Sequence, residues 1–597
     1  MNEQYALSEV TQRLADVAMG RRPADAVILD VKLINVITAE IQEGVDIAVA
    51  CGRIALVGDA KHAIGEGTRV YHGRGRYAAP GFIDGHLHIE SSMMMPGEYA
   101  RAVVAHGTTS IFPDPHEIGN VFGADGVRMM IDNSRDVPLR CFYLAPSCVP
   151  AVAKFEDSGE AIGTDAVREL IGMPEVAGLG EVMNYPAVLS GDTEVHEKIR
   201  DTLRAGKIVT SHYPLPAGDG RGMSGYIAAG NRCCHETTCA EDALAKLRLG
   251  MYVQVREGSA WRDLREVIRA VTQHKIDTRY VCLVSDDVHP HTLLADGHMD
   301  YIIRCAIEEG VDPICAIQMA TLNAAQCYRM DQDIGVIAPG RFADIVLLGD
   351  LERVVVEDVW INGEPVALDG CAQFVPPKPR LPERMLRGVR LARPLLPEDM
   401  RISAPGSAGN EVCVRVIQIV EARAQTHARE AWMAVCDGLV AADVEKNIAK
   451  VAVVERHHAT GTLGLGFVEG FGLRRGAVAS TIGHDAHNLQ IVGMNDSDMA
   501  FAGNELAAAG GGLIAVLDGA VIARLSLPIG GLMSDEGVHE IARHIEELDA
   551  AWKLLGSEIV APFMSMALLS LSVIPELRIT NRGLIDVLAF KETALFV

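Results

Sequence analysis

Apolar and polar positions alternate with two different periods along the chain. Residues 1–24 have an amphipathic pattern that predicts a helix. The next stretch, AVILDVKLINVITAEIQEGVDIAVACGRIALVGD, alternates β-branched and apolar residues with Gly, Asp and Asn, as short strands and turns do. From residue 81, apolar runs such as TTSIFPD, CFYLAPS and YVCLVSDD are separated by helical patterns such as DALAKLRLG. The chain is therefore predicted to pass from a small β-rich unit into parallel β/α units.

About eight apolar runs lie between residues 81 and 290, which fits an α/β fold with a closed (β/α)8 barrel of the TIM type over 81–334. An open doubly wound sheet is the alternative, but the sequence has no Gly-rich dinucleotide fingerprint to favour it. A strand-and-turn pattern returns in IGVIAPGRFADIVLLGDLERVVVEDVWINGEPV. We therefore predict that residues 25–80 and 335–385 form one split β-sandwich domain.

A Pro-rich stretch, FVPPKPRLPERMLRG, is expected to link this part to an additional C-terminal α+β domain over residues 400–597. A chain of 597 residues is long enough for about three domains. The apolar segment IVAPFMSMALLSLSVIP is shorter than the ~18–20 residues that cross a bilayer and contains Pro and Ser, so we expect it to be buried.

Charge and cysteine content narrow the possible partners. The formal net charge of −25 argues against nucleic acid and anionic membranes as partners. The first twenty residues lack the basic flank and apolar core of a signal peptide, and the thirteen cysteines are scattered without a framework spacing. These features predict a cytoplasmic protein with reduced thiols.

The stretch GFIDGHLHIESS places two histidines at the end of an apolar run. Successive side chains of a strand point to opposite faces, so His86 and His88 must point the same way. At the end of a barrel strand that direction is the mouth, where barrel enzymes have their active sites. The pair is therefore a candidate for half of a metal chelate.

Other strand ends offer the remaining ligands. GLGEVMN contains Glu181, KIVTSHY contains His212, NRCCHETT contains His235, and YVCLVSDD ends in Asp286 and Asp287. Each alone has an ordinary structural explanation, such as a histidine bonded to a carbonyl or an acid that caps a helix. Together, imidazoles and carboxylates suit Zn²⁺, Mn²⁺ or Fe²⁺, and six ligands could hold two ions ~3.5–4 Å apart with Glu181 between them.

The ordered series His-x-His, Glu, His, His and Asp, framed by APGFIDGHLH and IGVIAPGRFADIVLL, resembles the amidohydrolase superfamily over about residues 25–380. A longer match through FPDPHEIGNV, GEVMNYP, LVSDDVHP and GHDAHNLQIVG resembles the bacterial adenine deaminases over nearly the whole chain. The resemblance implies that His86, His88 and Asp286 bind one metal, that His212 and His235 bind the second, and that Glu181 bridges them.

This resemblance also implies a reaction and a cofactor. The site would hold a binuclear pair of divalent ions, with Mn²⁺ expected first and Fe²⁺ or Zn²⁺ as alternatives. Many members bridge their metals with a carboxylated lysine, and Glu181 stands there instead, which leaves open whether one or two ions bind. Hydroxide from metal-bound water would attack C6 of adenine, with Asp286 and Glu181 as catalytic carboxylates and Asp286 as the proton shuttle. The products would be hypoxanthine and ammonia, a step of purine salvage.

Several polar residues near the strand ends are weaker candidates. Glu90, Ser92, Asp114 and His116 are predicted to contact the substrate or to support the metal ligands, although helix caps and an Asp-Pro turn explain them about as well. A further trio, His484, Asp485 and His487, lies in the C-terminal domain, and we expect it to be a strand-edge cluster satisfied by backbone. Three histidines, His289, His291 and His298, are expected near the barrel mouth.

Two other functions remain open at this stage. A metal-dependent cyclic-amide hydrolase of the dihydroorotase or hydantoinase type would share the barrel, the metals and the nucleophile. Its anionic or ureide-like substrate calls for an Arg or Asn clamp, and only Arg232 and Arg256 lie within the ligand-bearing segments. A non-catalytic barrel scaffold predicts decayed ligands, whereas all six candidates are intact. Superfamily members are often homo-oligomers, so a dimer is expected.

Overall fold

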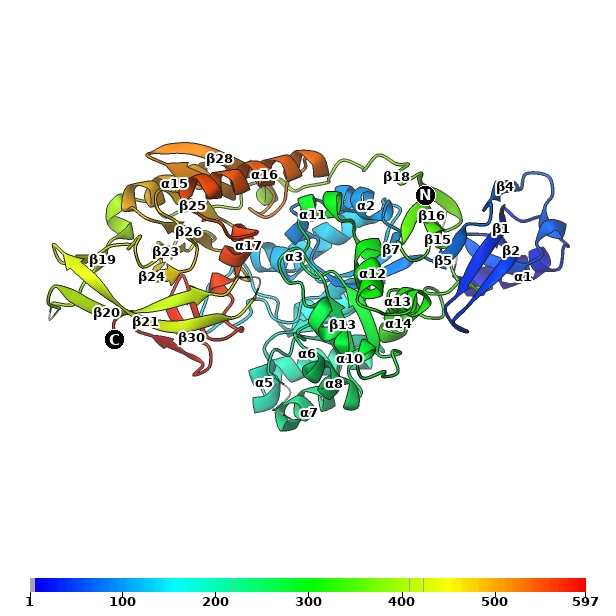
Figure 1. The fold of residues 1–597 in the computed structure, drawn as a ribbon, viewed down its shortest axis with the longest axis horizontal. Coiled ribbons are helices and arrows are strands. Elements are labelled where there is room, and N and C mark those ends of the chain that lie inside the picture. The colour runs from blue at the N-terminus through cyan, green and yellow to red at the C-terminus, as the bar shows by residue number, and fades with distance from the viewer. Residues whose placement is uncertain (1–5, 217, 219, 407, 422) are drawn as a thin grey trace.

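The computed structural model describes residues 6–216, 218, 220–406, 408–421 and 423–597. The chain has mixed α/β content in three regions that follow one another along its long axis (Figure 1). A β-rich unit lies at one end, an α/β region with a parallel sheet lies in the middle, and the C-terminal region lies at the other end.

The β-rich unit combines two segments far apart in the sequence. Helix α1 (Leu7–Ala18) packs beside β3, and β5 pairs in parallel with β1 and antiparallel with β15. Residues 26–80 and 345–372 therefore share one nine-stranded sheet. Its strands are β1 (Ala26–Asn35), β2 (Glu40–Ala50), β3 (Arg53–Gly58), β4 (Arg69–His72), β5 (Tyr77–Pro80), β15 (Ile345–Asp350), β16 (Val355–Ile361), β17 (Glu364–Leu368) and β18 (Cys371–Ala372).

The middle region is built on a curled parallel sheet. Strands β9 to β14 pair in sequence order, and β6, β7 and β8 form a second parallel group. The groups meet on both sides, because Phe142 N donates to Ile111 O (2.9 Å) and Asp286 N donates to His86 O (3.0 Å). The strands are β6 (Phe82–Leu87), β7 (Thr108–Pro113), β8 (Arg140–Cys141), β9 (Tyr143–Ala145), β10 (Val176–Val182), β11 (Ile208–Ser211), β12 (Asn231–Cys234), β13 (Tyr252–Arg256) and β14 (Val281–Val284).

Helices follow these strands and cover the outside of the curled sheet, so the strands are buried almost throughout. Residues 264–272 form two short helices in succession. The helices of this region are α2 (Pro96–Val104), α3 (His116–Ser134), α4 (Thr164–Ile171), α5 (Tyr185–Ser190), α6 (Thr193–Arg204), α7 (Gly220–Ala228), α8 (Ala240–Arg248), α9 (Leu264–Val267), α10 (Arg269–Thr272), α11 (Pro290–Ala295), α12 (Met299–Glu308), α13 (Pro313–Met319) and α14 (Leu322–Cys327).

An apolar interior cluster joins the strands of the curled sheet to the chain that follows them. The rings of Phe112 and Tyr328 stack with centroids 3.6 Å apart, and Phe342 packs into the same cluster. The strands contribute further residues to the cluster: Ile83, Leu144, Ala177, Ile208, Cys233, Tyr252 and Cys282. Burial of so much apolar surface holds the strands together, because every apolar Å² removed from water stabilises the fold.

The C-terminal region contains a ten-stranded sheet in the order β19-β22-β21-β20-β24-β23-β26-β25-β27-β28, and a small sheet of β29–β31. The strands and helices are β19 (Ile402–Ser403), β20 (Glu411–Ile419), β21 (Thr426–Cys436), β22 (Leu439–Val440), β23 (Ile448–Val454), β24 (Leu463–Glu469), β25 (Ala477–Ser480), β26 (Leu489–Gly493), β27 (Gly512–Leu517), β28 (Ala520–Ser526), β29 (Leu577–Thr580), β30 (Gly583–Asp586), β31 (Lys591–Thr593), α15 (Asp496–Ala508), α16 (Val538–Leu555) and α17 (Pro562–Ala567).

The apolar segment IVAPFMSMALLSLSVIP and the cysteines are both expected to lie within a folded, reduced protein. The apolar segment that contains α17 is largely buried, as expected, with Phe563, Met566 and Leu569 in the core. Among the described residues, no helix combines the length and the apolar character needed to cross a bilayer. The cysteines of the described residues are all free thiols.

Candidate metal centre and active site

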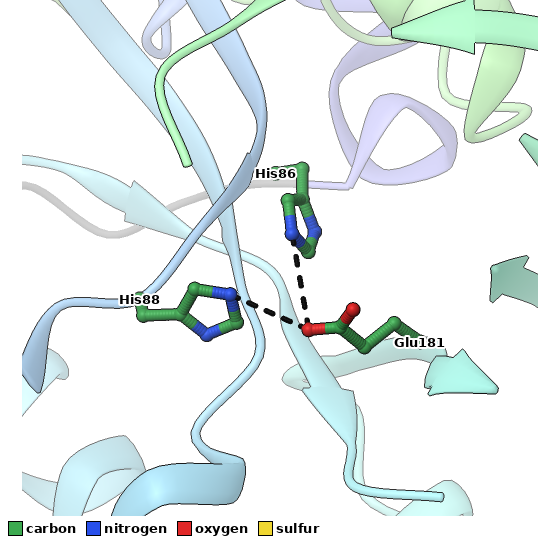
Figure 2. Close-up of side chains that lie close together, drawn as sticks. All are labelled: His86, His88 and Glu181. Atoms are coloured by element: carbon green, nitrogen blue, oxygen red, sulfur yellow. Dashed lines mark ion pairs between the residues drawn. The ribbon is translucent and has the colours of Figure 1, made fainter. Parts of the chain in front are cut away.

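The two histidines of the His-x-His stretch converge on one carboxylate oxygen. His86 lies at the end of β6 and His88 just after it, and their ring planes are nearly perpendicular. Glu181, near the end of β10, directs Oε1 at both rings, 3.9 Å from His86 Nε2 and 3.4 Å from His88 Nε2 (Figure 2). Side chains from two different strands therefore meet at the carboxyl edge of the sheet.

The other oxygen of Glu181 faces a second pair of histidines. Oε2 lies 2.6 Å from Nδ1 of His212, which follows β11, and 3.3 Å from Nε2 of His235, which follows β12. The carboxylate thus stands between two imidazole pairs, with one oxygen turned to each. This is the placement that a bridging ligand requires.

Asp286 completes the first half of the cluster. It follows β14, and its Oδ1 lies 3.4 Å from His86 Nε2 and 3.3 Å from His88 Nε2. All six residues predicted as ligands have at most 5% of their surface exposed. The structure therefore brings together every one of the six: His86, His88, Glu181, His212, His235 and Asp286.

Electrostatics keep the carboxylates of this cluster charged. Burial alone would raise the pKa of Glu181 and Asp286, but the neighbouring histidines outweigh it and hold both pKa values well below their usual range. Burial, together with the charge of His86, lowers the pKa of His235 to about 4. Ionised carboxylates beside a neutral imidazole are the protonation states in which these groups bind metal.

Several ring nitrogens of the cluster's histidines have no hydrogen-bond partner among the residues that the structure describes. Both ring nitrogens of His86, Nε2 of His212 and Nδ1 of His235 are buried without a hydrogen-bond partner. Buried polar atoms are almost always paired, so such a group of orphans calls for a ligand. Four imidazoles and two carboxylates match the preferences of Zn²⁺, Mn²⁺ and Fe²⁺. These residues therefore fit a metal ion.

Arg256, at the end of β13, ties Asp286 to two further acids. Its Nη1 donates to Asp286 Oδ2 (2.9 Å) and to Glu236 Oε1 (2.6 Å), while Nε and Nη2 donate to Asp263 Oδ2. Burial opposes the charge of Glu236, but Arg256 lowers its pKa to about 2. From the sequence, Arg256 is only a possible substrate clamp, because its spacing does not show that three carboxylates accept hydrogen bonds from it.

Two adjoining cavities lie over the centre and share four lining residues, Trp261, Asp287, His484 and Leu568. Ser91 also lines one of them, with Oγ 2.8 Å from Glu117 Oε1 and 2.5 Å from Asp287 Oδ1. A hydroxyl donates only one hydrogen, so one of these carboxyls must carry a proton. Burial raises the pKa of Glu117, which favours its protonated form relative to an exposed glutamate.

One of the four residues predicted to contact the substrate lines a cavity, and three do not. His116 lines a cavity, but Glu90, Ser92 and Asp114 line neither. Glu90 Oε1 accepts from Ile118 N, Ser92 Oγ donates to Ile89 O, and Asp114 Oδ2 accepts from Glu181 N (2.7 Å). Asp114 thus supports the backbone of Glu181, and the turn at residues 90–92 presents Ser91 rather than Ser92 to the cavity.

The expectation that the C-terminal trio is a separate strand-edge cluster is wrong for two of its members. His484 and Asp485 line the cavity together with the barrel residues, and His116 Nε2 lies 3.7 Å from Asp485 Oδ1. Only His487 follows the expectation, because its Nδ1 accepts from Gly483 N. The sequence pattern does not show which face of the curled sheet the C-terminal region covers, and the structure places that region over the centre.

The three histidines expected near the mouth lie in different surroundings. His289 lines a cavity beside Ser91 and Trp261. By contrast, His298 lies at the start of α12, where its ring bonds to Tyr99 Oη (3.1 Å) and Thr108 Oγ1 (2.7 Å). His291 lines neither cavity.

The class of protein follows from the centre and from two family matches. Residues 77–366 match the amidohydrolase family, and residues 423–591 match the adenine deaminase C-terminal domain. The curled parallel sheet with its histidine and carboxylate cluster is thus the hydrolase part of an amidohydrolase.

Full-length relatives give the particular family. An adenine deaminase of Clostridium botulinum (strain ATCC 19397 / Type A) is 52% identical over 99% of this chain and 98% of the relative. An adenine deaminase of Moorella thermoacetica is 52% identical over 98% of both chains, and one of Mesorhizobium japonicum is 44% identical over 99% of this chain and 98% of the relative. The chain belongs to the adenine deaminase family.

Proposed function

We propose that this protein hydrolyses adenine to hypoxanthine and ammonia at a pair of divalent ions held by the six-residue cluster. The observation that carries the proposal is the position of Glu181, whose Oε1 faces His86 and His88 while Oε2 faces His212 and His235. The relatives that span the whole chain bear the name of this reaction.

Each metal would have its own ligands. We assign one ion to His86, His88 and Asp286, the other to His212 and His235, and the bridge to Glu181. We interpret the curled sheet as the (β/α)8 barrel whose carboxyl edge carries such sites. An ion bound there would lower the pKa of its water and supply a hydroxide nucleophile near neutral pH.

Two carboxylates of the chain would carry out the proton transfers. Asp286 presents Oδ1 to the histidines while Arg256 holds Oδ2, so one oxygen stays in a fixed position at the centre. We propose that Asp286 accepts the proton of the attacking water, that Glu181 shares the proton transfer, and that the proton then reaches the purine ring and the departing amine at C6.

The arginines near the centre favour a neutral substrate. The donors of Arg256 are occupied by three carboxylates, and Arg232 donates to the carbonyls of Cys327 and Gln326. Neither guanidinium is therefore available to clamp the carboxylate of a dihydroorotate-like substrate. A neutral purine fits these surroundings, which disfavours the cyclic-amide hydrolase alternative.

The finer assignments are also proposals: Mn²⁺ as the resident ion, a homodimeric assembly, a cytoplasmic location and a role in purine salvage. The mixed imidazole and carboxylate ligands support Mn²⁺ but suit Fe²⁺ and Zn²⁺ as well. Sedimentation of the purified protein tests the dimer, and reconstitution with each ion tests the metal.

The proposed reaction is tested by ammonia release from the purified chain after metal removal and reloading with Mn²⁺, Fe²⁺ or Zn²⁺. Ammonia release is measured with adenine and adenosine, and ring opening of dihydroorotate and hydantoin, which frees no ammonia, is followed by separating substrate from product. We expect release from adenine that depends on the metal. His88→Ala should abolish it, whereas His274→Ala, at an exposed position, should not. Hydrolysis of a cyclic amide without release from adenine would overturn the proposal.

A further inference from the structure

A second cluster of metal-ligating side chains lies beside the proposed pair and belongs to two regions of the chain. His116 is the first residue of α3 in the middle region, whereas His484 and Asp485 follow β25 in the C-terminal region. All three are buried, with 4%, 9% and 1% of their surface exposed. We name these three residues the interdomain cluster.

Distances within this cluster are too long for hydrogen bonds. Asp485 Oδ1 lies 3.7 Å from His116 Nε2 and 3.5 Å from His484 Nδ1, and hydrogen bonds to charged groups are about 2.7–2.9 Å. All three ligand atoms nevertheless lie within 4.8 Å of one another. Ligands placed about 2.0–2.2 Å from one tetrahedral ion are separated from each other by roughly 3.3–3.6 Å.

The proposed catalytic pair provides an internal comparison. There, the ligand atoms of His86 and His88 lie 3.3–3.4 Å from Asp286 Oδ1, and that of His235 lies 3.3 Å from Glu181 Oε2. The spacings of the interdomain cluster are only slightly longer. The same combination of imidazole and carboxylate, at similar spacing, therefore occurs twice on this side of the molecule.

Two further atoms of the same residues, on the sides away from the three ligand atoms' contacts, also have no partner among the described residues: Asp485 Oδ2 and His116 Nδ1 are buried without a hydrogen bond. Acids gather around them, since Glu117 Oε1 lies 4.0 Å from His484 Nδ1 and Asp114 Oδ1 lies 3.6 Å from His116 Nδ1. An uncompensated buried charge is costly, so these carboxyl groups favour positive charge close to them.

We propose that His116 Nε2, His484 Nδ1 and Asp485 Oδ1 hold a further divalent cation, separate from the pair bridged by Glu181. Two nitrogens and one oxygen suit Zn²⁺, Mn²⁺ or Fe²⁺, with a fourth position open to water or to Glu117. The ion would link the C-terminal region to the barrel beside the cavity. It would stabilise the packing of these two regions, because metal binding stabilises the folded arrangement.

The test counts metal in the full-length protein after chelation and reloading with Mn²⁺ or Zn²⁺ and removal of excess ion. We expect Asp485→Asn and His484→Gln each to contain one ion fewer per chain than the wild type. Glu156→Gln changes a buried acid close to Asp485 that is not one of the three ligands, and it should keep the wild-type count. Equal metal content in the wild type and in both cluster variants would overturn the proposal.

A second measurement needs no variant. Anomalous scattering from crystals of the reloaded wild type should give a peak about 2.0–2.2 Å from the three named atoms. Its absence would overturn the proposal even if the pair at Glu181 is occupied. The two proposals can fail independently. The proposed reaction is tested by adenine turnover and its loss in His88→Ala. The further site is tested by a difference of one ion per chain, which is expected whether the pair at Glu181 holds one ion or two.

Discussion

The interior of the curled sheet and its carboxyl edge are made by the same strands but differ in chemistry. Ala177, Ile208 and Cys282 pack into the apolar interior cluster, and four residues later each strand reaches Glu181, His212 or Asp286. Side chains four apart share a face of a strand and lie about 13 Å apart. One inward face therefore supplies both an apolar core and a ring of ionisable groups.

The difference shows how the curled sheet supports a site whose buried charges are costly. Apolar residues of the interior cluster stabilise the fold by leaving water, whereas the buried acids and histidines of the edge are stable only when paired with each other or with an ion. Loss of an interior residue should therefore reduce stability, while loss of an edge residue should reduce activity and metal content. Four experiments examine this division.

The largest effect is expected for Glu181→Gln, which removes the charge between the two histidine pairs. We expect kcat/KM for adenine to fall about 10³-fold or more and the metal content to fall with it, because the amide is a poor bridging ligand. Steady-state kinetics and metal analysis measure both. The thermal midpoint of the metal-free protein should change little, and a retained activity within tenfold of wild type would contradict the proposed bridge.

Phe112→Ala is the corresponding change in the interior cluster. Phe112 is fully buried and stacks on Tyr328, so the free energy of unfolding should fall by about 3–5 kcal/mol. The metal count of the folded protein should stay at the wild-type value. Denaturant unfolding and metal analysis provide the test, with Phe112→Leu as a milder control. Loss of metal without loss of stability would reverse the comparison.

Arg256→Lys tests the contacts that support the edge. A single ammonium cannot replace the fork that joins Asp286, Glu236 and Asp263, so Asp286 should lose its fixed orientation. We expect kcat to fall about 10–100-fold with a smaller change in KM. Arg232→Lys, where the partners are carbonyls, is the matched control and should retain most of the activity. Equal losses in both variants would argue against positioning by Arg256.

The smallest effect concerns a buried acid outside the centre. Burial, reinforced by the nearby charge of Asp485, raises the pKa of Glu156 to about 8, above its ordinary value of 4.5. The folded state therefore keeps a proton that the unfolded state loses, and this group's contribution to stability declines as the pH rises from about 4.5 to about 8. Glu156→Gln should remove this decline, so its thermal midpoint should exceed that of the wild type at pH 9 by more than at pH 5.

Much of the site could be predicted from the sequence because strands impose a simple geometry. The alternation of side chains places His86 and His88 on one face, and parallel strands bring Glu181, His212, His235 and Asp286 to one edge. These rules need no knowledge of tertiary packing. The strand pattern also paired the segments that β5 and β15 join.

What could not be predicted depends on contacts between segments far apart. The position of His484 and Asp485 beside His116 requires knowing how the C-terminal region packs on the barrel, and no local pattern contains that information. The presentation of Ser91 instead of Ser92 follows from the tight turn over residues 90–92. The engagement of Arg256 follows from acids contributed by three separate places in the chain.

The pairing of β5 with β15 has a consequence for the order of assembly on the ribosome. The two partners, Pro80 and Ile345, are 265 residues apart in the chain, and every strand of the middle region lies between them. At about 5–20 residues per second, the edge of β5 waits roughly 13–53 s for its neighbour to be synthesised. During that interval the N-terminal sheet has an open edge, so its completion comes after translation of the whole segment it encloses.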